Sequence, residues 1–91
     1  MKVDVDTTLK HIDGNDLPLT LKKACIEALM AQTQDDRASG EVKFKRYELA
    51  VKVNSGATVD ISPEEAAMLK DLIGKVYGPG VVGPAYKLLN G

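Results

Sequence analysis

The first 19 residues show the alternation of apolar and polar positions that is typical of β-strands. Val3 and Val5 alternate with aspartates, and the polar sequence DGND at 13–16 separates two short apolar stretches. An Asp-Gly pair suits the backbone of a tight hairpin turn. Pro18 lacks an amide hydrogen, so the second of the two strands is expected at a sheet edge. The pattern predicts a short N-terminal β-hairpin.

Later stretches carry apolar residues at helical spacing. Thr20 is a suitable N-cap for a first helix over about 20–33, and the polar run at 34–36 predicts a loop. The sequence SPEE at 62–65 predicts a capping box that opens a helix over 62–77. Gly78-Pro79-Gly80 is expected to end that helix. The apolar tail from Val81 to Leu89 predicts a last short helix that starts near Pro84.

The stretch 40–53 predicts a helix with two apolar rows. Phe44, Tyr47 and Val51 recur at spacings of three and four residues, which is the spacing of a core-facing row. The second row consists of Val42, Leu49 and Val53. Such a helix either lies at the centre of the bundle or connects the core to a binding partner.

The combined pattern predicts an α+β fold that is mainly helical, with three to four helices, the hairpin and a small strand at about 57–61. The length of 91 residues fits a single domain over 1–91. The strand at 57–61 is expected to pair with the N-terminal arm, either of the same chain or of another copy. With no Trp and one Phe, the core depends on aliphatic residues, and oligomerisation is a plausible additional source of buried area.

Charge and hydropathy exclude several classes of protein. The net charge of −1 lacks the basic excess of a dedicated nucleic-acid binder. No stretch approaches the roughly 20 apolar residues of a membrane helix, and the N-terminus lacks the apolar core of a signal peptide. A single cysteine allows no internal disulfide. We therefore expect a cytoplasmic protein, in a bacterial or viral setting.

The residues that carry chemistry are few. His11 is the only imidazole and Cys25 the only thiol, and Cys25 lies on the apolar side of its helix. A Cys25–His11 pair stays open as an alternative to a buried cysteine and a surface histidine. One His and one Cys do not make a zinc site, and no phosphate-loop or calcium-loop pattern is present. We expect no enzyme activity, no catalytic residues, no cofactor and no metal.

The basic run at 43–47 supports an alternative function. It mixes cations with aromatic residues, as single-strand binders do. In this hypothesis the protein is a small regulatory nucleic-acid binder, and its basic helix at 43–52 contacts nucleic acid through Lys43, Lys45, Arg46 and Lys52. The third helix opens with two glutamates, which would repel phosphates.

Several segments carry a family resemblance. They are KRYELA at 45–50, VDISPEE at 59–65, LIGKVY at 72–77, VVG at 81–83 and AYKLL at 85–89, and the stretches at 12–14 and 19–21 fit the same pattern. Together they resemble small uncharacterised proteins that tailed phages and prophages encode. The resemblance implies a phage-gene context and no particular activity.

The first functional hypothesis is therefore a non-enzymatic phage or prophage accessory or assembly protein that acts through protein–protein contacts. Its partner is either another protein or a second copy of the chain. The predicted partner-contact residues are the second row of the 40–53 helix and the start of the apolar tail: Val42, Leu49, Val53, Val81 and Val82.

Overall fold

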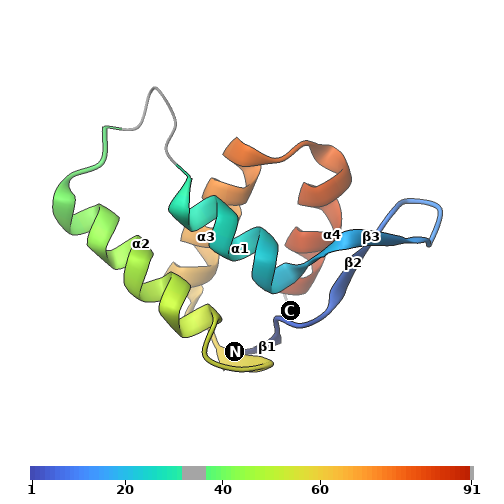
Figure 1. Ribbon diagram of the computed structural model, residues 1–91, viewed down its shortest axis with the longest axis horizontal. Helices are drawn as coiled ribbons and strands as arrows, with labels where there is room; N and C mark the ends of the chain where they lie inside the picture. Colours follow the sequence, from blue (N-terminus) through green and yellow to red (C-terminus); the bar gives the residue numbers. More distant parts are fainter. Residues whose placement is uncertain (32–36, 91) are drawn as a thin grey trace.

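The computed structural model describes residues 1–31 and 37–90. Within these residues it contains four helices and four short strands, which form two separate two-stranded antiparallel sheets beside the helices (Figure 1). The elements are β1 (Lys2–Asp4), β2 (Thr8–Lys10), β3 (Asp16–Thr20), α1 (Leu21–Met30), α2 (Gly40–Val53), β4 (Thr58–Asp60), α3 (Pro63–Val76) and α4 (Pro79–Leu89). The predicted α+β, mainly helical fold is confirmed. The loop predicted at 34–36 lies outside the described residues.

Two strand pairings organise the N-terminal arm. β2 and β3 form the predicted hairpin, and its turn contains Gly14 at a φ of +90°, a backbone conformation that favours glycine. β1 pairs with β4 in an antiparallel register that sets Val3 opposite Val59. The strand predicted at 57–61 thus pairs with the N-terminal arm of its own chain. The alternation of side chains places Val3 and Val5 in the core and Asp4 and Asp6 in solvent.

The hydrophobic core takes buried side chains from seven of the eight described elements, and Leu17 and Leu19 of β3 are partly buried against it. Helix α1 is central, since it packs against α2 and also against α3. Its buried side includes Leu21, Cys25 and Leu29. Helix α2 lies at one end of the molecule and the β2–β3 hairpin lies at the other end (Figure 1).

Helix α4 differs from the prediction. It begins at Pro79, five residues before the predicted start, and it continues through Pro84. Pro79 occupies the first turn, where a missing amide hydrogen costs nothing. The amides of Val81 and Val82 already donate to the Gly78 carbonyl, so the helix is established before Pro84 is reached. Either proline is compatible with a helix start, and the earlier one is used.

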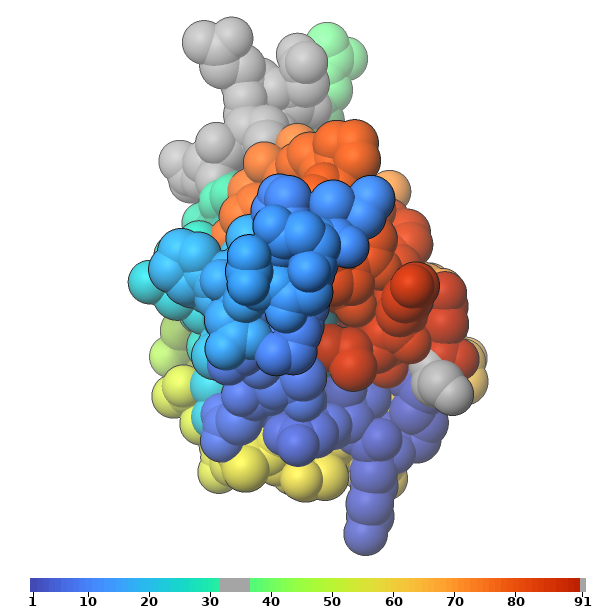
Figure 2. Space-filling model, turned by 90° about the vertical axis from the view of Figure 1, so that its right-hand side faces the viewer, coloured from blue at the N-terminus to red at the C-terminus, as the bar shows by residue number. Residues whose placement is uncertain are grey.

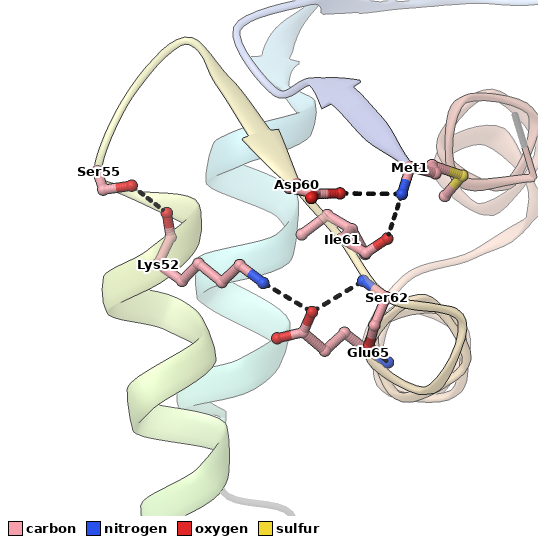
Figure 3. Close-up of polar contacts among 7 residues, drawn as sticks. All are labelled: Met1, Lys52, Ser55, Asp60, Ile61, Ser62 and Glu65. Atoms are coloured by element: carbon pink, nitrogen blue, oxygen red, sulfur yellow. Dashed lines mark hydrogen bonds and ion pairs between the residues drawn. The ribbon is translucent and has the colours of Figure 1, made fainter.

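The start of α3 is connected to α2 through Glu65 (Figure 3). Glu65 Oε1 accepts a hydrogen bond from the Ser62 amide at 2.8 Å, and Ser62 Oγ accepts one from the Glu65 amide at 3.1 Å. These two bonds form the predicted capping box. Lys52 Nζ, near the end of α2, also donates to Glu65 Oε1 at 2.8 Å. One carboxylate therefore caps α3 and holds the C-terminal turn of α2.

Replacement of Glu65 by Ala is expected to lower the free energy of unfolding by about 1 kcal/mol, because it removes half of the capping box and leaves Lys52 without its carboxylate. Burial raises the pKa of Glu65, but the hydrogen bonds from Lys52 and Ser62 outweigh it and hold the pKa below its ordinary value. The contribution of Glu65 is thus present at neutral pH and lost as the pH falls through this lowered pKa. Urea unfolding at neutral and acidic pH measures both effects.

The neighbouring Glu64 supplies the matched control. Its side chain is exposed, and the Glu64→Ala variant is expected to change the free energy of unfolding by less than about 0.5 kcal/mol. Equal losses for the two variants would contradict the role assigned to Glu65.

Candidate contact surface on helix α2

Helix α2 is apolar on two opposite sides. One side is buried against α1 and the rest of the core, and Leu49 is 5% exposed and Val53 0% exposed there. Val51 follows Leu49 by two residues, a step that turns about 200° around the helix axis. The Val51 side chain therefore points away from the core and is 54% exposed. The sequence predicts both apolar rows. In the structure the row with Leu49 and Val53 faces the core, and the row with Val51, which the spacing predicts to face the core, is exposed.

Phe44, Tyr47 and Val51 form one continuous exposed row, which we call the outer stripe. Spacings of three and four residues put the three side chains on one side of the helix. Phe44 is 60% exposed and Tyr47 is 53% exposed. Their rings stack with centroids 6.5 Å apart. Helix α2 lies at the edge of the molecule (Figure 1), and each of the three side chains is more than half exposed.

Leu49 and Val53, which the sequence predicts as partner contacts, are not on the surface of the folded chain. Both side chains belong to the hydrophobic core, because the packing of α2 against α1 takes up the aliphatic row rather than the aromatic one. Val42 lies on the same inward side two turns before Leu49, where it is still 38% exposed. Val81 and Val82 on α4 are half-buried and pack against the core, so only part of each side chain is exposed. The exposed apolar row of α2 is thus the outer stripe and not the predicted row.

The four cations of the nucleic-acid hypothesis do not form a single surface. Lys43 and Lys45 lie about 200° apart around the helix, on opposite sides of the outer stripe. Lys52 lies on the same side of the helix as Lys45, and its ammonium group bonds to Glu65. Arg46 is half-buried on the Lys43 side. Positive charge is therefore split between two flanks rather than gathered in a phosphate-binding patch.

A second surface feature lies at the opposite end of the molecule. A groove of about 650 Å³ runs between β2 and the start of the hairpin turn on one side and α4 on the other. The hairpin and α4 lie side by side on this face (Figure 2). Its lining includes Leu9, Ile12, Gly83 and Leu88, with Lys87 among the polar groups. Ile12 is almost fully exposed beside the turn. The groove is mainly apolar, and its polar lining consists of Thr7, Thr8, Lys10, His11 and Lys87.

Cys25 and His11 occupy different environments. The Cys25 side chain is completely buried, and burial raises the pKa of its thiol to about 12. The His11 ring is exposed in the hairpin, with Nδ1 at 3.2 Å from Asp13 Oδ1. A fully buried, protonated thiol cannot attack a substrate. Across residues 1–31 and 37–90, no three His, Cys, Asp or Glu side chains lie close enough together to hold a metal ion.

Comparison of the chain with protein-family models, curated proteins and solved structures finds no match. In the part of the chain that the structure describes, no helix is both long enough and apolar enough to cross a membrane. Among the described residues, the outer stripe of α2 gathers three large exposed apolar side chains on one side of a helix.

Proposed function

We propose that this protein is a non-enzymatic accessory or assembly protein of the phage or prophage type, and that it acts in the host cytoplasm through protein–protein contacts. The observation that carries the proposal is the outer stripe. Three large apolar side chains on one side of a helix, each more than half exposed, form a continuous patch of the kind that marks interaction sites. Aromatic residues are also enriched in the cores of protein interfaces.

Two further features support a protein partner over the alternatives. The cations of α2 are divided between two flanks and alternate with Glu41 and Glu48, which disfavours the binding of nucleic acid. The only thiol is buried in the core, where it behaves as a small apolar side chain. The resemblance to phage and prophage proteins supports the biological setting.

Photo-crosslinking in bacterial cells tests the proposal. The photoreactive residue p-benzoylphenylalanine is placed at position 47, where an aromatic side chain is already exposed. We expect a discrete adduct with one protein, which mass spectrometry identifies and maps to a single peptide. The adduct should be lost when Phe44 and Val51 are both replaced by Ser.

Position 71 provides the control, because Asp71 is an exposed residue on α3 that pairs with Lys75. The same probe at position 71 is expected to form no discrete adduct. Adducts of position 47 with nucleic acid would instead support the regulatory nucleic-acid binder. Labelling at position 47 no stronger than at position 71 would overturn the proposed function.

A further inference from the structure

We infer that the outer stripe binds a second copy of this chain, with the two α2 helices antiparallel. The inference rests on the proposed function, since it names the occupant of the same surface. Its first support is the order of side-chain sizes along the stripe. With the two-fold axis between positions 47 and 48, Phe44 lies opposite Val51 of the second copy. The two Tyr47 side chains then meet at the centre. The large ring of one helix thus faces the small side chain of the other, and the surface is self-complementary, as a two-fold interface requires.

The second support is the order of charges along one flank of the stripe. Glu41, Lys45, Glu48 and Lys52 follow one another at spacings of four, three and four residues, so their signs alternate along the helix. An antiparallel two-fold axis brings this flank against the same flank of the second copy, read in the reverse direction. Along one copy the signs run minus, plus, minus, plus, and along the reversed second copy they run plus, minus, plus, minus. Each charge therefore lies beside an opposite charge.

The central pairs determine the register. Lys45 lies within about one helical turn of Glu48 of the second copy. Because the dimer is two-fold symmetric, the same pair occurs a second time with the two copies exchanged. Glu41 lies near Lys52 of the second copy, but the Lys52 ammonium already bonds to Glu65 of its own chain. The two Lys45–Glu48 pairs are therefore expected to carry most of the electrostatic specificity.

These charges are available for a second copy. Glu41, Lys45 and Glu48 are all exposed. Within residues 37–90, no ion pair joins Glu41 to Lys45 or Glu48 to Lys52, although both pairs have the spacing that supports such bonds inside a helix. On the other flank the two Lys43 residues lie about 13 Å apart along the helices and do not oppose each other.

A parallel pairing fits these charges less well. It would set each residue of the stripe against its own copy, so that Phe44 meets Phe44 and Val51 meets Val51. It would also bring the Lys45 flank against the Lys43 flank, where two lysines approach each other. Both size and charge thus favour the antiparallel arrangement.

The expected dimer is weak. Helix α2 has 14 residues and a length of about 21 Å, and its outer stripe supplies less than the roughly 800 Å² per partner of a standard stable interface. We therefore expect a dissociation constant in the micromolar range or weaker. This estimate sets the protein concentrations that a test must cover.

Sedimentation equilibrium of the purified protein at low salt, up to about 1 mM, tests the inference. The average mass should rise with concentration from that of one chain toward that of two. Replacement of Phe44 and Val51 by Ser should abolish this rise. Glu48→Lys should weaken the dimer about tenfold, since it sets lysine against lysine twice. The double variant Lys45→Glu/Glu48→Lys should bring the dissociation constant back to within about threefold of the original.

Asp71→Lys is the control for net charge, because it adds the same charge on α3 and should leave the dimer unchanged. A protein that stays monomeric throughout, or a dimer that survives loss of the stripe, would overturn the inference. A double charge exchange that fails to restore the dimer would overturn the antiparallel register. If the protein is monomeric and position 47 nevertheless crosslinks to one mapped site on a different protein, the self-association fails while the proposed function stands.

Discussion

Replacement of Val53 by Ala is expected to lower the free energy of unfolding by about 2–3 kcal/mol, whereas replacement of Val51 by Ala leaves it unchanged or raises it slightly. Val53 is completely buried, so its loss removes two buried methyl groups and leaves a cavity. Val51 is 54% exposed, and Ala has the higher helix propensity at that position. The two positions share residue type and helix, and differ mainly in the side they face.

Urea unfolding at low protein concentration measures this pair of variants without a contribution from self-association. A loss of 2–3 kcal/mol is a large part of the stability of a domain of this size. Equal losses at the two positions, or a larger loss at Val51, would show that α2 is rotated and that the outer stripe belongs to the core.

Stability is also expected to fall steeply in alkali because Cys25 is buried. Burial raises the pKa of its thiol from 9.0 to about 12, so the folded protein disfavours the thiolate. For a group whose pKa is raised by folding, stability is fully present below the unfolded pKa and declines as the pH rises toward the folded pKa. Between pH 8 and about pH 10.5 the loss from Cys25 alone is about 2 kcal/mol.

Chemical unfolding under reducing conditions at several pH values measures this effect. The Cys25→Ala variant is expected to be less stable than the wild type at neutral pH. Between pH 8 and about 10.5, however, its free energy of unfolding should decline much less than that of the wild type. Tyr77 adds a second contribution at higher pH. Burial and the hydrogen bond to Glu27 raise the pKa of Tyr77 to about 12. A Cys25→Ala variant that declines as steeply as the wild type would contradict the burial of the thiol. Rapid alkylation of Cys25 in the native protein would contradict it as well.

Local signals predict the element positions well because the interactions behind them span few residues. The capping box of Ser62 and Glu65 is formed within four residues and appears as predicted. The same holds for the hairpin turn at Gly14 and for the N-cap of α1, where Thr20 Oγ1 accepts a hydrogen bond from the Lys23 amide. Helix α1 ends at Met30, three residues before the predicted limit.

The orientation of α2 depends on contacts that are distant in sequence. Both of its apolar rows have helical spacing, and periodicity alone does not say which row faces the core. Packing against α1 decides this, and it turns Leu49 and Val53 toward the core. The row that the sequence predicts as the contact row is therefore the one whose Leu49 and Val53 are buried. A signal for the outer stripe does exist in the sequence, since the alternating charges of Glu41, Lys45, Glu48 and Lys52 border the aromatic row rather than the aliphatic one.

Two-dimensional amide NMR spectra of the purified protein at low and high concentration test most directly the claim that the outer face of α2 is the contact surface. We expect the signals of residues on and beside the outer stripe, namely Phe44, Tyr47, Glu48 and Val51, to shift with concentration. Those of the hairpin and α4 should stay in place, and replacement of Phe44 and Val51 by Ser should abolish the shifts. Concentration-dependent shifts centred on the hairpin–α4 groove, with α2 unaffected, would contradict it.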